Sequence, residues 1–348
     1  MPVDPFGEIV SGNQLVVEAK LRAKIFSSYL EKEVLASARD TMRKNEKHHW
    51  WPTSISKFWG RDKDKKLTQM GKEYIRRYYP KQVGSIPDHN TKSSGDQSLE
   101  ALYSDLVERK IGDTFRKLNI LSNNVIDSSH DGQWILEDLS ELDRQNIARY
   151  TGAMLVRTPY TVGHRGERTI SGEFMGTIGM GAFAGLQSGR RINGVAESEP
   201  LSREEVGSTM DIVLDFAISL LPALIVDQYE REVVLVFNRS KAGYVFSDAG
   251  YFAHKSGREG LAYYPLLPNV CAVYRESHYR KSNHFMTGAI AGDDFRDEIN
   301  RAIISRTQKY VYSSVYPSKY LISEVNAHIG SKYPAPFVRT GNLLHRPI

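Results

Sequence analysis

The stretch from Arg231 to Asn269 constrains the fold more than any other, because apolar runs alternate there with turn-forming residues. Over 233–237 apolar side chains occupy both sides of an extended strand, which is typical of a strand that is covered on both faces. A turn at 238–243 leads to a second run, 244–248, in which Asp248 shares a face with two aromatic residues. We therefore expect a buried hairpin with Asp248 at its tip, where an inward carboxylate needs a partner.

The segments around this hairpin are mostly helical in pattern. Helical spacing of apolar residues predicts helices over 12–42, 98–115, 140–157, 202–226 and 293–312, and a short basic helix over 69–79. Further strands are predicted at 134–136 and 265–274. The sequence thus predicts an α+β fold in which about six or seven helices surround a small, mainly antiparallel sheet. We expect a single domain over 1–348, with a helical arm (1–44), a core (45–315) and a C-terminal tail (316–348).

Composition narrows the class of protein. Of the 348 residues, 41% are hydrophobic and 25% are charged, as in soluble globular proteins. The single cysteine, Cys271, excludes an intramolecular disulfide and lies in an apolar setting typical of a buried side chain. The N-terminus lacks signal-peptide features, and Asp215 and Pro222 interrupt the longest apolar stretch. A cytoplasmic protein without a membrane segment is expected.

Positive charge is concentrated in one segment. Twelve Lys or Arg stand against four Asp or Glu between Arg43 and Lys81, whereas the net charge of the whole chain is only +5. Such a basic segment favours nucleic acid as a partner. It includes 48–60, HHWWPTSISKFWG, whose proline favours extended backbone at the histidines. The side chains that we expect to bind nucleic acid here are Trp50, Trp51, Lys57, Trp59 and Arg61.

Two other patterns are weaker. The glycines of 160–200 do not match the spacing of a dinucleotide-binding loop, and no clear strand precedes them. Asp211 and Asp215 lie four residues apart on one helix face and could serve a metal or an acid/base step. A solvated helix face is the favoured interpretation of the two aspartates.

Five short motifs occur in an order that resembles a largely bacterial family, domain of unknown function 4238. They are His48-His49-x-x-Pro52, Arg157-Thr158-Pro159, the strand 244–248 ending in Ser247-Asp248, Pro265-Leu-Leu-Pro268-Asn269, and Asn300. The resemblance covers about 45–315. It departs from the family after Asp248, where Ala249-Gly250 replaces Asn-Pro. The family brings no assigned chemistry, although its scattered occurrence suggests a context of bacterial defence.

The motif residues suggest a site. The imidazoles of His48 and His49 and the carboxylate of Asp248 are suited to acid/base catalysis. His49 and Asp248 could also bind a divalent metal. Arg157 could hold a phosphate, and Ser247 and Asn269 are further candidates for binding. The first hypothesis is a hydrolase of nucleic acid or nucleotides, such as a nuclease or phosphodiesterase.

Alternatives to a hydrolase stay open. One is a non-catalytic nucleic-acid-binding module and another is a protein-interaction module. A His-Asn-His nuclease is disfavoured, because the next histidine, His89, lies in a loop rich in Pro, Gly and Ser. The histidines and Asp248 could also be structural residues that fix two segments together.

Overall fold

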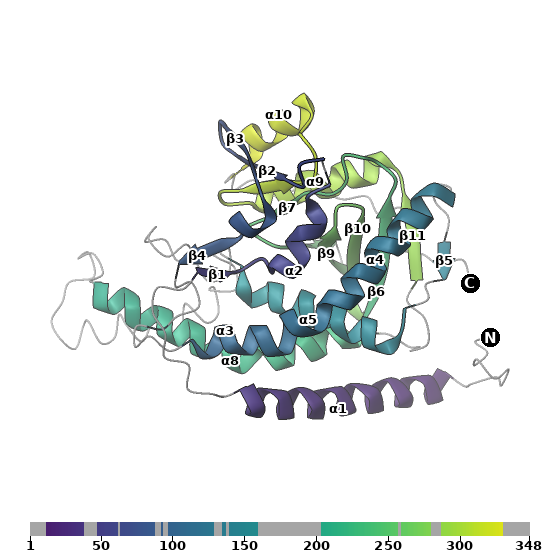
Figure 1. The fold of residues 1–348 in the computed structure, drawn as a ribbon. Helices are drawn as coiled ribbons and strands as arrows, with labels where there is room; N and C mark the ends of the chain where they lie inside the picture. The colour runs from purple at the N-terminus through teal and green to yellow at the C-terminus, as the bar shows by residue number, and fades with distance from the viewer. Residues whose placement is uncertain are drawn as a thin grey trace.

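The computed structural model describes residues 12–37, 47–61, 63–87, 92, 97–128, 134–136, 139–158, 203–256, 259–279 and 287–329. Within them, strands form sheets of two, six and four strands, with helices packed around them (Figure 1). The predicted α+β class is confirmed. The single small sheet that we expected is instead divided among these three sheets.

The six-stranded sheet is the centre of the fold. Its spatial order is β5-β11-β6-β10-β9-β8, and all pairs are antiparallel except β11 with β6. The strands are β5 (Trp134–Leu136), β6 (Arg231–Asn238), β8 (Phe252–Ser256), β9 (Glu259–Leu267), β10 (Val270–Tyr279) and β11 (Thr287–Ala291). Leu235 on one face of β6 and Val236 on the other belong to different hydrophobic cores. The prediction of a strand covered on both faces is therefore confirmed.

The predicted hairpin between β6 and 244–248 is wrong. Both edges of β6 are already paired, with β10 and β11. After the turn the chain leaves this sheet, because the Tyr244 amide donates to the Pro268 carbonyl (2.6 Å) and the Val245 amide to Asn300 Oδ1 (2.8 Å). Strand β7 (Phe246–Ser247) then joins the four-stranded sheet.

The four-stranded sheet joins distant parts of the chain in the order β3-β2-β12-β7. Its other strands are β2 (Leu67–Gly71), β3 (Tyr74–Tyr78) and β12 (Val311–Ser313). Residues 69–79 therefore form a hairpin, not the short basic helix that we predicted. Similarly, the helix predicted to reach 312 ends at Arg306, and β12 follows it.

The histidine motif lies on a small sheet. Strand β1 (Lys47–His49) pairs with β4 (Ser85–Pro87), so the prediction of extended backbone at the histidines is confirmed. The predicted strand at 265–274 is instead two strands, because it spans the end of β9, a turn at Pro268-Asn269 and the first half of β10. The prediction of a strand at 134–136 is confirmed by β5.

Helices cover the sheets. They are α1 (Gly12–Ser37), α2 (Thr53–Ser56), α3 (Ser98–Tyr103), α4 (Arg109–Ser128), α5 (Glu141–Arg157), α8 (Arg203–Glu230), α9 (Asp293–Arg306) and α10 (Lys319–His328), with short η1 (Lys57–Trp59), η2 (Pro80–Gln82) and π-helical η3 (Ser104–Glu108). Helix α5 begins at the expected cap, where Ser140 Oγ accepts from the Asp143 amide (3.2 Å).

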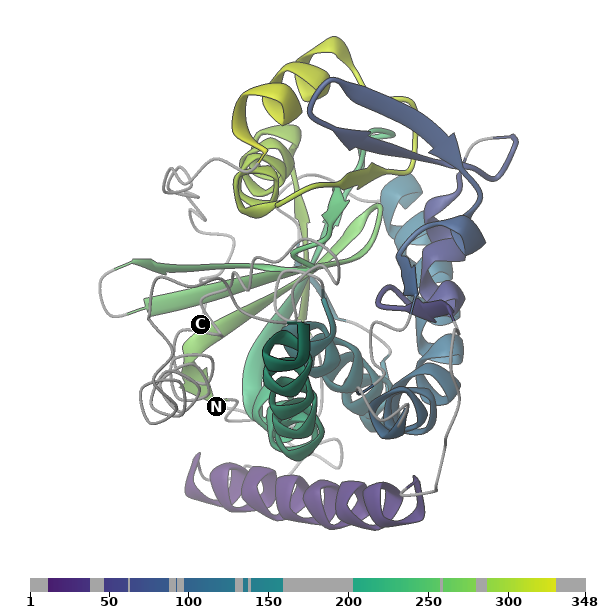
Figure 2. The same cartoon turned by 90° about the vertical axis from the view of Figure 1, so that its left-hand side faces the viewer.

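Two terminal helices mark opposite ends of the molecule. Helix α1 runs beneath α8, whereas α10 lies beside the β2–β3 hairpin at the other end (Figures 1 and 2). Helix α10 falls in the segment that we predicted as a tail. Among the described helices, none combines the length and the apolar character needed to cross a bilayer.

Candidate nucleic-acid interface

The three tryptophans of the histidine motif belong to the core. Their exposed fractions are 3% for Trp50 and 0% for Trp51 and Trp59. Trp51 stacks on Phe246 of β7 at 4.2 Å between ring centroids and also meets Tyr312 of β12 at 5.3 Å. We call Trp50, Trp51, Trp59, Phe246 and Tyr312 the tryptophan cluster. The prediction that these tryptophans bind nucleic acid is wrong, because the rings of the cluster cover one another.

Asp248 has the partner that its burial demands. It follows β7 directly and is 0% exposed. Its carboxylate accepts three backbone N–H groups from the loop before β12, those of Gln308 (3.0 Å), Lys309 (2.7 Å) and Tyr310 (3.1 Å). This arrangement ties β7 to β12, with which it pairs. The carboxylate thus holds the 308–310 loop in place, which agrees with the hypothesis that Asp248 is a structural residue.

Arg157 is held by acidic partners at the end of α5. Its guanidinium is fully buried, donates to Glu108 at 2.6 Å, lies 3.7 Å from Glu100, and covers the Tyr103 ring at 4.6 Å. Burial alone lowers the pKa of Arg157, but the two carboxylates outweigh it and raise the pKa. A buried cation engaged in this way fixes α5 to α3 and η3, and a phosphate would have to displace its partners.

The histidines lie on β1. The contact described for His49 involves neither Asp248 nor Arg157. The His49 ring lies 3.5 Å from the Lys81 carbonyl, measured from Nε2. Only the backbone of His48 is described. Among the described residues, no three His, Cys, Asp or Glu side chains gather as a metal site would require. The side chains predicted to share a metal, His49 and Asp248, instead contact the Lys81 carbonyl and the 308–310 amides.

The remaining predicted binding residues also connect segments. Asn269 accepts from Arg61 and donates to the Asn238 carbonyl at 2.5 Å, so it fastens the β9–β10 turn to both. Burial lowers the pKa of Arg61. The Ser247 hydroxyl accepts from the Ala249 amide at 3.2 Å. Lys57 is the exception, since it is exposed on η1.

The motifs therefore come together, but as packing partners. Gly250, at φ 73°, lies so close to α5 that a Cβ there would stand 2.5 Å from the Thr158 side chain. Asn300 binds both sides of the 243–245 turn, donating to the Gly243 carbonyl at 3.1 Å. Contacts of this kind link the Arg157-Thr158 motif, the 244–248 segment and Asn300. Ala249-Gly250 is thus suited to a tight turn against α5.

Two weaker sequence patterns have different outcomes. Asp215 is exposed and pairs with Lys92 at 2.6 Å, in agreement with the solvated face that we favoured. The glycine-rich segment 160–200 lies outside the described residues.

The β2–β3 hairpin presents a surface of a different kind, which the sequence reasoning missed. Tyr74, Arg76 and Tyr78 share one face of β3, and the two hydroxyl groups lie 2.5 Å apart. Arg76 lies over the Tyr74 ring at 5.3 Å, and Lys66 lies over the Tyr79 ring at 5.0 Å. We call these five residues the basic hairpin surface, of which Tyr74, Arg76 and Tyr78 lie on one face of β3 and Lys66 and Tyr79 lie just outside the two strands at the base of the hairpin. The signal that could have revealed it is the two-residue alternation of tyrosine and arginine.

This surface extends to the loop before β12. The Tyr310 ring, just before β12, lies 6.1 Å from that of Tyr74 and carries Lys309 Nζ at 5.5 Å. Tyr79 is 46% exposed, so its ring is accessible to a ligand. Burial and the hydrogen bond to Tyr78 raise the pKa of Tyr74 to about 12.

Comparison with models of known protein families, with curated proteins and with solved structures found no match for this chain. The resemblance to domain of unknown function 4238 thus stays a prediction from the motifs.

Proposed function

We propose that this protein binds single-stranded nucleic acid without cleaving it, through the basic hairpin surface. The observation that carries the proposal is the placement of cations over tyrosine rings of the hairpin, Lys66 over the exposed Tyr79 and Arg76 over the half-buried Tyr74. Proteins that bind single strands combine positive charge for the phosphates with aromatic faces on which bases stack. Lys72 and Lys81, both exposed, extend the positive charge along the same segment.

The hydrolase hypothesis has less support. Asp248 is occupied by three backbone amides and Arg157 by two glutamates, so each already has a structural role. A catalytic group must reach the reacting atom within hydrogen-bond range. Burial at 0% exposure makes that approach difficult for both side chains.

The salt dependence of binding tests the proposal. Fluorescence anisotropy with a labelled oligouridylate should give an affinity that falls linearly with salt on a double logarithmic scale. Replacing Arg76 or Lys66 by Gln should each reduce the slope by about 0.7, the value for one phosphate contact on a single strand. Tyr79→Ala should weaken binding by about 1–3 kcal/mol at an unchanged slope, because it removes stacking alone.

A matched control is available on α1. Lys24→Gln removes the same charge from an exposed position at the opposite end of the molecule and should leave the slope unchanged. Equal effects of Lys24 and Arg76 substitutions would mean that the hairpin is not the interface. Shortening of the oligonucleotide during the assay would favour the hydrolase instead.

A further inference from the structure

Helix α1 has two apolar faces, and the described structure covers only one of them. On the inner face Ala23, Phe26 and Leu30 are buried, and the Phe26 ring lies 4.9 Å from the Tyr229 ring of α8. On the outer side no other described helix or strand lies beyond α1 (Figures 1 and 2). A helix that packs on one side is expected to carry polar residues on the other.

The outer face carries a row of apolar side chains instead. Leu21, Ile25 and Tyr29 recur every four residues, so they form one ridge along the helix. Their exposed fractions are 56%, 53% and 64%. Ile120, which is 55% exposed on α4, has no exposed large apolar neighbour among the described side chains of that helix. We call Leu21, Ile25 and Tyr29 the outer row, and contiguous exposure of this kind marks an interaction surface.

The flank of the outer row changes its charge along the helix. Lys20, Lys24, Ser27 and Glu31 share this flank, because they follow one another at spacings of four, three and four residues. The Ser27 hydroxyl donates to Glu31 Oε1 at 3.5 Å, in agreement with this placement. The two lysines and Glu31 are exposed. The flank is therefore positive before Ile25 and negative after it.

Two other charged residues of α1 are engaged on its inner side. Arg22 lies 3.8 Å from the Glu141 carboxylate of α5, and Glu33 lies 2.8 Å from the Arg149 guanidinium of the same helix. These ion pairs fix the rotation of α1 about its axis. The outer row consequently points away from the rest of the described structure.

We propose that α1 pairs with α1 of a second copy of this chain, in antiparallel orientation. Pairing about Ile25 places Leu21 of each copy against Tyr29 of the other, so the outer row covers itself. A two-fold axis brings the same flank of both helices together. Lys20 lies five residues before Ile25 and Glu31 six residues after it. Each Lys20 therefore meets Glu31 of the other copy, while Lys24 lies opposite Ser27.

Other arrangements fit the charges less well. In a parallel pair Lys20 and Glu31 would lie about 16 Å apart along the axis, at 1.5 Å per residue, and could not meet. An anionic lipid surface would attract Lys20, Lys24 and the exposed Lys32 but would repel Glu31. The outer row is also narrower than the apolar face of helices that lie in a membrane interface.

Pairing through α1 does not depend on the proposed function. The β2–β3 hairpin lies at the opposite end of the molecule from α1 (Figures 1 and 2). Both copies therefore keep their basic hairpin surface free, one at each end of the dimer. Because one helix from each copy forms the interface, monomers and dimers should exchange as the protein concentration changes.

Sedimentation velocity of the full-length protein over a wide range of concentrations tests the pairing. The sedimentation coefficient should rise from that of a monomer to that of a dimer. Ile25→Glu should raise the dissociation constant by about a hundredfold, because two carboxylates would face each other at the two-fold axis. Ile120→Glu adds the same charge at an equally exposed position of α4 and should leave the dissociation constant unchanged. Thermal unfolding should confirm that both variants fold.

Exchange of the flank charges tests the orientation. Lys20→Glu and Glu31→Lys should each raise the dissociation constant by about fivefold, because each removes two exposed ion pairs per dimer. The variant with both substitutions should dimerise like the original protein.

Three results would overturn the proposal. One is a monomer at every concentration, and another is a dimer that Ile25→Glu leaves intact. A double exchange that fails to restore the dimer would overturn the antiparallel arrangement. Vesicles of phosphatidylserine and phosphatidylcholine provide the remaining comparison, since a monomer that sediments with them through Ile25 would assign the outer row to a lipid surface instead.

Discussion

At the scale of single residues, buried polar side chains in this protein hold segments together. Asp248 binds three consecutive backbone amides, Asn269 connects a turn to Arg61, and Asn300 binds the chain on both sides of Tyr244. Each satisfies groups that would otherwise be buried without partners. Residue types that are common in catalytic sites are equally suited to this role.

Replacing Asp248 by Asn tests that role. The substituted amide keeps one oxygen acceptor but presents an NH₂ group to backbone N–H donors, so hydrogen bonds from 308–310 are lost. We expect a loss of about 2–3 kcal/mol in the free energy of unfolding, as for charge-assisted hydrogen bonds and an unsatisfied buried donor. Urea denaturation measures it. Asp294→Asn should change stability by less than about 0.5 kcal/mol, as a surface substitution.

A stable Asp248→Asn variant would contradict the structural assignment. In that case the carboxylate would be available for chemistry, and the hydrolase hypothesis would regain its support.

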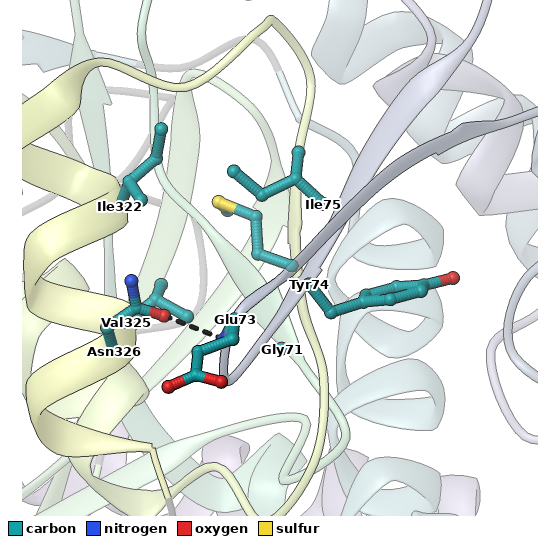
Figure 3. Close-up of a pocket in the computed structure, with 8 residues that line it drawn as sticks. Gly71, Glu73, Tyr74, Ile75, Ile322, Val325 and Asn326 are labelled. Atoms are coloured by element: carbon teal, nitrogen blue, oxygen red, sulfur yellow. Dashed lines mark hydrogen bonds between the residues drawn. The ribbon is translucent and has the colours of Figure 1, made fainter.

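At the scale of elements, the β2–β3 hairpin supplies the proposed nucleic-acid interface and, together with α10, lines a cavity of about 270 Å³ (Figure 3). Its buried strand β2 pairs with β12, while β3 is the outer strand with its tyrosines and arginines half-exposed or exposed. The turn between them contains Glu73 and is fastened to α10 by Asn326. The position of the hairpin therefore depends on a helix near the end of the described chain.

Glycine at the hairpin turn should stabilise the protein. Glycine adopts the left-handed conformation at position 73 (φ 58°) without the steric cost that a side chain brings. We therefore expect Glu73→Gly to raise the free energy of unfolding by about 0.5–1 kcal/mol. Thermal denaturation measures the change.

The neighbouring turn residue provides the comparison. Lys72 lies outside the left-handed region, so Lys72→Gly should only add freedom to the unfolded chain and lower stability. If both substitutions destabilise the protein equally, the turn stores no strain at Glu73.

At the scale of the whole molecule, tyrosines make up much of the interior. Burial raises the pKa of a set of phenols distributed over both cores, Tyr103, Tyr150, Tyr244, Tyr263, Tyr274 and Tyr312. For Tyr274 the pKa rises to about 12. Because each of these phenols is harder to ionise in the folded protein than in the unfolded chain, its ionisation at alkaline pH favours the unfolded chain.

Alkaline pH should therefore destabilise the protein steeply. In the folded state the phenols stay protonated, whereas in the unfolded chain they ionise near their ordinary pKa of 10. Stability is thus complete below pH 10 and falls as the pH rises toward 12, by about 1.4 kcal/mol per pH unit for each such tyrosine. Urea denaturation across this range measures the loss. Tyrosinate absorbance that develops near pH 10 without unfolding would contradict the expectation.

Local patterns in the sequence predicted local features well. The cap at Ser140, the two buried faces of β6 and the need of Asp248 for a partner all follow from residues close together in the chain. Strand partners do not, because β7 pairs with β12 and β6 with β11, both of which are distant in sequence.

The candidate site was harder to predict for the same reason. Arginines and lysines around 69–79 satisfy a helical pattern as well as an extended one, so periodicity alone did not identify the hairpin. Its cavity additionally requires Ile322, Val325 and Asn326 of α10, which lie in the segment predicted as a tail. Side chains that meet only in the folded protein leave no pattern in either segment.

The pairing of β2 with β12 has a consequence for synthesis. Residues 67–71 leave the ribosome long before their partners at 311–313. Strand β6 is likewise synthesised before its partner β11 at 287–291. During translation the tryptophan cluster lacks Phe246 and Tyr312, so its rings stay exposed. The nascent chain should therefore depend on chaperones until its last strands emerge, and truncated products should aggregate rather than fold.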